Sequence, residues 1–129
     1  VSVVVPDYDA ALDFYVGVLG FDLIEDTRLS AAKRWVLVAP PGSTECRLLL
    51  ANASDEAQSR SIGNQTGGRV FLFLTTDDCP RDMTRMQAAG VRFEGAIRFE
   101  AYGKVVVFSD PFGNLWDLIE PASAPPRSG

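Results

Sequence analysis

The chain has 129 residues, of which 47% are hydrophobic and 22% charged, enough for one globular domain with its own core. Its net charge of -5 argues against a nucleic-acid partner, because duplex binding needs a basic face. No apolar run approaches the ~20 residues of a membrane span, and no signal peptide is visible. Cys46 and Cys79 form no CxxC motif, so we expect free thiols. These features favour a cytoplasmic protein whose partner is a small molecule rather than a membrane.

The first part of the chain predicts a strand, a helix and three more strands. Residues 1–6 are rich in β-branched side chains, as in strands. Residues 7–20 predict a helix that starts at Asp7 or Asp9 and stops at Gly20. Apolar residues recur in it at helical spacing, namely Ala11, Phe14, Tyr15, Val18 and Leu19. Three predicted strands then follow, at residues 21–29, 33–40 and 46–51.

The second part predicts the same order of elements. Residues 53–68 are polar and glycine-rich, which indicates a linker with room for one short helix. Residues 69–76 predict a strand, and residues 77–90 predict a helix capped by Asp77 or Asp78, with Pro80 in its first turn. Further strands are predicted at 91–99, 103–110 and 114–121, and residues 122–129 are expected to be a disordered tail.

The two parts repeat each other at a spacing of about 70 residues. Gly20 corresponds to Gly90, and Arg28 corresponds to Arg98. The sequence therefore predicts an α+β protein made of two tandem βαβββ modules, residues 1–52 and 69–121, joined by the linker 53–68 within one structural domain. We expect the two modules to form a common surface between them.

Two stretches carry a family resemblance. The opening VVVPDYDAALDFYVGVLGFDL and the closing VVFSDPFGNLWDLIEP resemble the ends of the vicinal oxygen chelate superfamily, over residues 1–121. That superfamily includes glyoxalases, extradiol dioxygenases and bleomycin resistance proteins. The resemblance implies two curled, mixed sheets around an open cavity, which usually holds a divalent metal bound by histidines and glutamates. It also implies a homodimer. The activity itself is left open, because one fold hosts several functions.

The metal-ligand positions that this resemblance implies carry few possible ligands here. The first position falls just upstream of Val1, and the second falls on Arg47 or Leu49. The third falls on Phe71, with Arg69 as the alternative, and the fourth falls on Asp117. Since catalytic metal sites normally need about three protein ligands, we expect no metal cofactor, with Asp117 as a weak candidate ligand.

Strand alternation separates two faces of the predicted sheets. One face is apolar and should pack under the helices: Val1, Val3, Val5, Leu48, Leu50, Val70, Leu72, Leu74, Trp116 and Leu118. The other face is mixed and has the composition of a cavity wall: Ser2, Val4, Arg47, Leu49, Arg69, Phe71, Phe73, Asp117 and Ile119. Trp35 and Tyr102 are further candidates for contact with a ligand.

Asp117 lies between hydrophobic neighbours, so its charge needs a partner or exposure to water. One hypothesis is that Asp117 faces the cavity and pairs with Arg47 or Arg69. The alternative is a solvated carboxylate at a sheet edge, with both arginines as ordinary surface residues and Phe71 and Phe73 in the core.

The favoured function is that of a metal-poor protein, like the bleomycin resistance proteins, which binds a small molecule and sequesters a drug. The alternative is a metal-dependent lyase or dioxygenase that uses a histidine upstream of Val1 together with Asp117. A structural or regulatory domain is less favoured, because such a domain would fill its mixed face with aliphatic side chains.

Overall fold

A computed structural model describes residues 1–122. Residues 123–129 of the expected disordered tail lie outside the described residues, and the backbone N–H of Ala122 donates to the Tyr102 carbonyl at 2.8 Å. Within residues 1–122, the helices are too short or too polar to cross a membrane. Cys46 and Cys79 are both free, as predicted.

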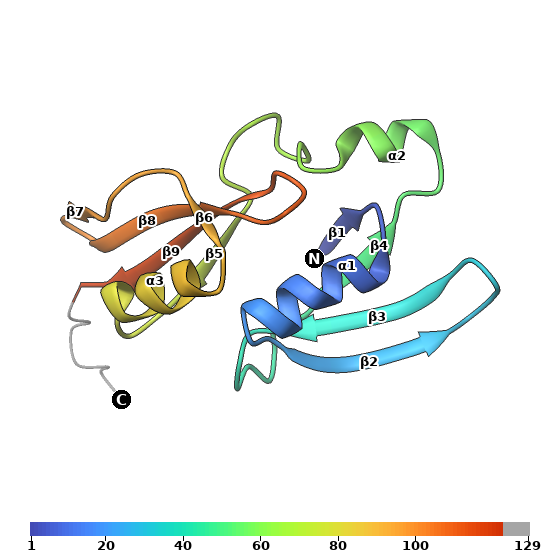
Figure 1. Ribbon diagram of the computed structural model, residues 1–129, viewed down its shortest axis with the longest axis horizontal. Coiled ribbons are helices and arrows are strands. Elements are labelled where there is room, and N and C mark those ends of the chain that lie inside the picture. Colours follow the sequence, from blue (N-terminus) through green and yellow to red (C-terminus); the bar gives the residue numbers. More distant parts are fainter. Residues whose placement is uncertain (123–129) are drawn as a thin grey trace.

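The first module contains one mixed sheet and one helical segment (Figure 1). Its strands lie in the order β1-β4-β3-β2, with β1 and β4 parallel and the other neighbours antiparallel. In chain order the elements are β1 (Ser2–Val5), α1 (Tyr8–Leu12), the π-helix η1 (Asp13–Val18), β2 (Asp22–Arg28), β3 (Arg34–Ala39) and β4 (Leu48–Asn52).

The linker and the second module follow. The linker contains the short helix α2 (Glu56–Ser61). The second sheet has the order β5-β9-β8-β6, with β7 paired to β8 and a parallel β5–β9 pair. Its elements are β5 (Leu72–Thr75), α3 (Cys79–Ala88), β6 (Arg92–Phe93), β7 (Arg98–Glu100), β8 (Gly103–Ser109) and β9 (Leu115–Pro121). The predicted α+β class with two mixed sheets is confirmed.

Two predicted elements differ in detail. The helix of residues 7–20 starts with Asp7 as its cap but changes to a π-helix at Asp13, with bonds such as that from the Leu19 N–H to the Phe14 carbonyl. The single strand predicted for residues 91–99 is split into β6 and β7. Gly95 lies in the gap between β6 and β7. Its φ of +133° is outside the backbone region that strands require, so the strand is interrupted there.

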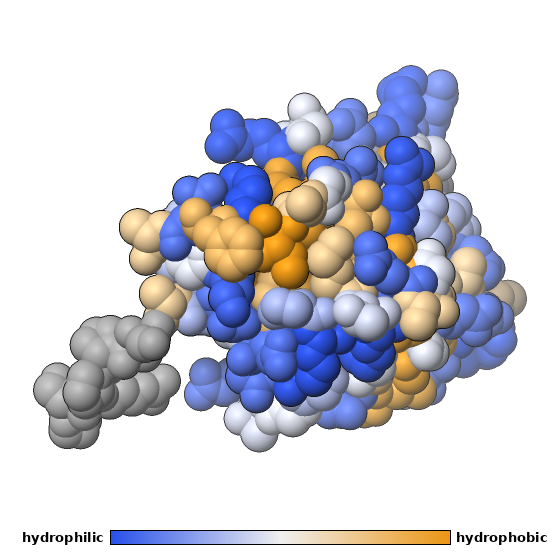
Figure 2. Space-filling model, turned by 60° about the vertical axis from the view of Figure 1, so that its left-hand side comes forward, coloured by the Kyte–Doolittle hydropathy of each residue, from blue (hydrophilic) through white to orange (hydrophobic). Residues whose placement is uncertain are grey.

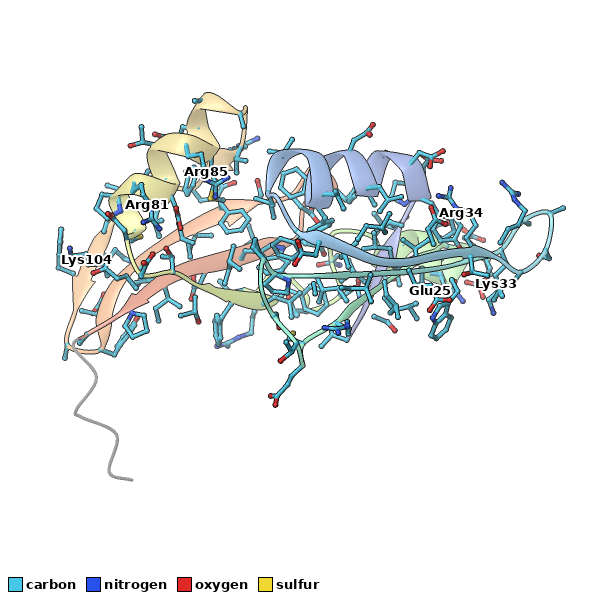
Figure 3. The ribbon with its side chains drawn as sticks, turned by 90° about the horizontal axis from the view of Figure 1, so that it is seen from below. Glu25, Lys33, Arg34, Arg81, Arg85 and Lys104 are labelled. Carbon is cyan, nitrogen blue, oxygen red and sulfur yellow. The ribbon has the colours of Figure 1, made fainter. Side chains whose placement is uncertain are left out.

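Helices α1 and α3 lie on the same side of the two sheets, and the opposite side carries no helix in the part of the chain that is described (Figure 3). The core fills the space under the helices, where Val3, Val5, Leu48, Leu50, Trp116 and Leu118 are buried as predicted. Leu72 and Leu74 are only partly buried against this core, and Val70 is also only partly buried. Val1 lies outside β1 and is 64% exposed.

The two modules meet at an aromatic cluster. The Tyr15 ring of η1 packs against the Trp116 indole of β9, with centroids 5.9 Å apart, and Trp116 stacks on Phe108. The Tyr15 hydroxyl donates to the Asp110 Oδ2 at 2.7 Å and accepts from the Trp116 Nε1 at 3.3 Å. Because all these groups are buried, the cluster fixes the first helix against the second sheet.

The linker also joins the modules. The Gln65 side chain bonds the outer edge of β1 as a neighbouring strand would, since its Oε1 accepts from the Val4 N–H at 2.8 Å and its Nε2 donates to the Ser2 carbonyl. Gly63 packs so closely on the 110–114 turn that a Cβ there would lie 1.8 Å from the Phe112 carbonyl oxygen. The linker is therefore packed against both modules.

Candidate functional site

The uncovered side of the second sheet presents one carboxylate between apolar side chains. Asp117 of β9 is paired with Phe73 of β5 on one side and with Val107 of β8 on the other. Cross-strand partners share a face, so the three side chains form a row across the sheet. The Phe73 side chain is 70% exposed, although it is large and apolar. We call this row, together with Ile119 of β9 and Arg98 of β7, the second-module face.

Asp117 has few polar contacts on this face. Its Oδ1 is buried and has no hydrogen-bond partner within residues 1–122, where Asp117 also forms no ion pair. Burial raises the pKa of the Asp117 carboxyl above its ordinary value, and the charge of Arg98 partly opposes this rise. An incompletely satisfied carboxylate beside an exposed ring can accept a hydrogen bond from a ligand or attract its positive charge.

The predicted pairing of Asp117 with Arg47 or Arg69 is wrong. Arg47 precedes β4, and its guanidinium donates to the carbonyls of Ser43 and Cys46. Arg69 precedes β5 and is exposed, because the strand begins only at Leu72. Strand propensity predicted that both strands begin earlier than they do, and both arginines lie outside the strands.

The arginine that acts on Asp117 is Arg98. It pairs with Val105 of β8, which pairs in turn with Ile119, so Arg98 lies two strands away from β9 on the same face. Its guanidinium is within 3.6 Å of Glu100. The sequence alone does not place Arg98 on this face, because the register between β7 and β8 decides which side of the sheet its side chain takes.

The other second-module candidates lie in different surroundings. Phe71 precedes β5, donates its N–H to the Leu115 carbonyl at 2.8 Å, and packs partly against the core. Tyr102 lies in the turn between β7 and β8 and is 54% exposed. Figure 2, in which the second module is turned forward, shows an apolar area with hydrophilic residues around it. The structure does not bring Tyr102 into the row of Phe73 and Asp117.

Trp35 and Leu49 line a separate cavity of about 620 Å³ at the first module. Trp35 is 39% exposed. Arg34, which also lines the cavity, bonds Asp26 at 2.6 Å and Asp9 at 2.9 Å, so its charge is already paired. Asn52 contributes a buried Oδ1 that has no hydrogen-bond partner among residues 1–122. The lining of this cavity is mixed, since Lys33, Ser54 and Gln58 also contribute to it, and it lacks the carboxylate found on the second-module face.

The residues present do not fit the metal that the fold family usually holds. Strand β4 presents Leu49 at the position that Asp117 occupies in β9, and neither Leu49 nor Phe71 can bind a cation. Within residues 1–122, no three His, Cys, Asp or Glu side chains are grouped to hold a metal ion. Among the described residues, Asp117 therefore stands as a single carboxylate without the further ligands that a metal site needs.

Comparison with known proteins places this geometry in a family. The family model "Glyoxalase/Bleomycin resistance protein/Dioxygenase superfamily" matches residues 1–118. A Shewanella frigidimarina protein is 56% identical over 121 residues, which cover 93% of this chain and 90% of that protein.

Two solved structures are also similar. A superfamily member from Sphaerobacter thermophilus has 31% identity and a TM-score of 0.78, and the match covers 93% of each chain. TnmS3, described as an antibiotic binding protein from a Streptomyces species, has 35% identity and a TM-score of 0.75, with 95% of this chain and 93% of that chain covered. The chain therefore belongs to the glyoxalase/bleomycin resistance protein/dioxygenase superfamily.

Proposed function

We propose that this protein binds and sequesters a small organic molecule on the uncovered faces of its sheets. The ligand has a flat apolar part and a hydrogen-bond donor or positive charge. The apolar part lies on Phe73, and the donor meets the carboxylate of Asp117. Arg98 lies at the edge of the same face, where it can receive a ligand acceptor.

One observation carries this proposal: a buried Asp117 Oδ1, which has no hydrogen-bond partner within residues 1–122, stands next to Phe73, which is 70% exposed. The unsatisfied oxygen costs stability because it loses its water on folding, whereas the exposed ring gains little from folding. A ligand that donates to the carboxylate and covers the ring removes the cost and buries the apolar area.

The relatives support binding rather than a particular ligand. TnmS3, which is 35% identical, is described as an antibiotic binding protein. Sequestration needs a complementary face and no reactive group, which agrees with a lone carboxylate surrounded by apolar side chains.

The test is a thermal-shift screen of flat aromatic amines, phenols and antibiotics, followed by calorimetry on the best ligand. Phe73→Ala and Asp117→Asn should each weaken binding about tenfold, because each removes one of the two main contacts. Phe99→Ala is the matched control, since Phe99 is 77% exposed but its strand partner is Lys104, which places it outside the row.

The same screen includes nickel, zinc, manganese and iron(II). Equal affinity of all three variants for the ligand would contradict the proposed site. A large shift with one metal, lost in Asp117→Asn, together with turnover of a ligand, would instead favour the lyase or dioxygenase alternative.

We further propose that two copies associate through these faces. Trp35 is 39% exposed and Phe73 70%, which leaves one large apolar side chain uncovered on each module. Light scattering should give a molar mass twice that of one chain. The double variant Trp35→Lys/Phe73→Lys should give the mass of a single chain. A monomer at high concentration would contradict the association.

A further inference from the structure

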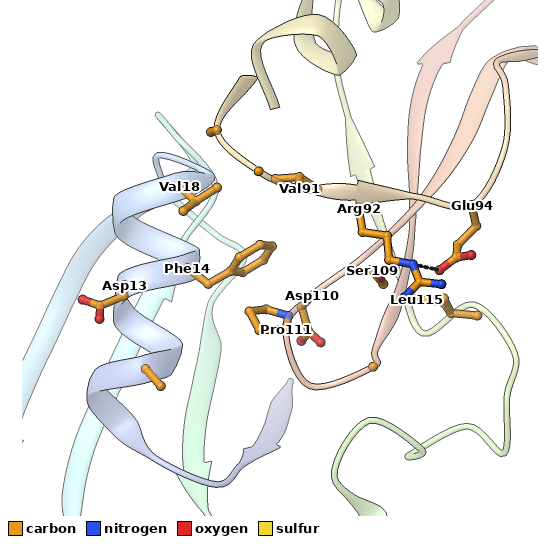
Figure 4. Close-up of a pocket in the computed structure, with 14 residues that line it drawn as sticks. Asp13, Phe14, Val18, Val91, Arg92, Glu94, Ser109, Asp110, Pro111 and Leu115 are labelled. Carbon is orange, nitrogen blue, oxygen red and sulfur yellow. Dashed lines mark ion pairs between the residues drawn. The ribbon is translucent and has the colours of Figure 1, made fainter. Parts of the chain in front are cut away.

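A second cavity lies at the junction of the two modules, apart from the second-module face (Figure 4). Its volume is about 620 Å³, within the usual range for small-molecule sites. The first module contributes Phe14 and Val18 of η1, and the second contributes residues 89–94 and the 109–115 turn region. We call it the junction cavity.

One wall of the junction cavity is apolar. In Figure 4, Phe14 and Val18 of η1 lie opposite the segment that carries Val91. Phe14 and Val91 are each 7% exposed, so this wall is closely packed and leaves a small apolar surface for a ligand.

The remaining wall is predominantly negative. Asp110 is 4% exposed and accepts four hydrogen bonds, from the Tyr15 hydroxyl, from the Asn114 Nδ2, and from the N–H groups of Phe112 and Asn114. Among residues 1–122 no cation pairs with it. Burial of the Tyr15 hydroxyl raises its pKa, and the negative charge of Asp110 raises that pKa further. Charges buried without a counter-ion are uncommon, so Asp110 gives the cavity a fixed negative field.

Among residues 1–122, Arg92 is the one cation that lines the cavity, and its ion pair is weak. Arg92 lies 3.4 Å from the Glu94 carboxylate, and the two side chains are 78% and 38% exposed (Figure 4). Exposed ion pairs of this kind contribute little to stability. Of the two side chains, that of Glu94 is the more buried. A ligand cation could therefore replace Arg92 at Glu94 at small cost. Asp13 also lines the cavity, but its carboxylate points away from the hollow in Figure 4.

We propose that the junction cavity binds a small organic amine, whose ammonium group replaces the Arg92 guanidinium at Glu94 and whose apolar part lies against Phe14, Val18 and Val91. Because its walls come from both modules, the bound amine bridges them. This site does not depend on the proposed function of the second-module face.

The test compares three probes that share a phenethyl group and differ in the charge of their head group: phenethylamine, 2-phenylethanol and 3-phenylpropionate. Amide NMR shifts of the wild-type chain give the affinity and the location. The amine should bind at least about fivefold more tightly than the acid, with the largest shifts at residues 14–18 and 90–94.

Charge variants distinguish the site from a generic acidic surface. Glu94→Gln should weaken the amine about fivefold, whereas Arg92→Gln should strengthen it, because the competing guanidinium is gone. The matched control is Glu56→Gln, which removes the carboxylate of a surface pair with Arg60 at 3.0 Å.

Tighter binding of the acid, absence of amine binding, or equal effects of Glu94→Gln and Glu56→Gln would each overturn the proposal. Shifts confined to residues 73, 107 and 117 would overturn it too, and would support the second-module face as the amine site instead.

Discussion

The two modules have the same strand pairing but different chemistry at one equivalent position. In the first module, Leu49 of β4 is paired with Ser2 of β1 and with Leu37 of β3. In the second, Asp117 of β9 is paired with Phe73 of β5 and with Val107 of β8. A leucine thus stands where the repeat has a carboxylate.

This difference shows how a duplicated fold can divide its roles. The covered sides of both sheets are apolar, since Leu48 and Trp116 occupy equivalent buried positions. The uncovered sides are free to diverge, because no helix constrains them. The first module keeps an aliphatic centre, and the second presents a carboxylate, which we propose as the anchor for a ligand.

Trp116→Ala would break the comparison most strongly. The Trp116 indole contacts Tyr15, Phe21 and Phe108 and so links the two modules. Leu48, by contrast, packs in the core under the first sheet. We expect a loss of about 3–5 kcal/mol in unfolding free energy for Trp116→Ala, and about 2–4 for Leu48→Ala. Urea unfolding measures both. A larger loss at Leu48 would contradict the linking role of the tryptophan.

Exchanging the two divergent residues sharpens the comparison. Leu49→Asp places a partly buried carboxylate among aliphatic side chains and should cost about 1–3 kcal/mol. Asp117→Leu removes such a carboxylate and should be neutral or stabilising by up to about 1 kcal/mol, while ligand binding is lost. Chemical unfolding and calorimetry give both values, and a strong destabilisation by Asp117→Leu would show that the carboxylate has a structural partner.

The stabilising effect of Asp117→Asn should depend on pH. Because burial raises the pKa of Asp117, the folded chain holds this proton more tightly than the unfolded chain does. The wild-type chain therefore loses stability as pH rises from the ordinary carboxyl value through the raised pKa. Asp117→Asn should match the wild type near about pH 3 and exceed it at neutral pH. Thermal melts from acidic to neutral pH test this, and Asp82→Asn is not expected to follow the same curve, because the pKa of Asp82 is lowered.

The smallest expected effect concerns Arg98. Removing its charge in Arg98→Gln should raise the pKa of Asp117 further, since Arg98 is the cation that lowers it. Carbon NMR titration of the aspartate side chains detects this change. Arg47→Gln and Arg69→Gln serve as controls, and an equal effect of either one would restore the pairing that the structure contradicts.

Much of the fold could be predicted from the sequence, because it depends on local signals and on the repeat. Alternation identified the covered face through Val3, Leu50 and Leu118, and Asp7 and Asp78 cap their helices as capping chemistry requires. The π-helix could not be predicted, because its spacing of apolar residues also fits an α-helix.

The candidate site was predicted less completely. Alternation placed Asp117 and Phe73 on one face, and they do share a row. Arg98 was missed because only the β7–β8 register places it on that face, and a register is a tertiary property. The junction cavity was missed for the same reason, since Phe14 and Glu94 meet only when the modules pack together.

The most direct test of the second-module face is an amide NMR titration of the wild-type chain with the best ligand from the screen. We predict that the largest shifts fall on residues 73, 107 and 117, with weaker changes at Arg98, and that Asp117→Leu abolishes them. Shifts confined to the Trp35 and Leu49 cavity, or unchanged binding in Asp117→Leu, would contradict the assignment of the carboxylate as the ligand anchor.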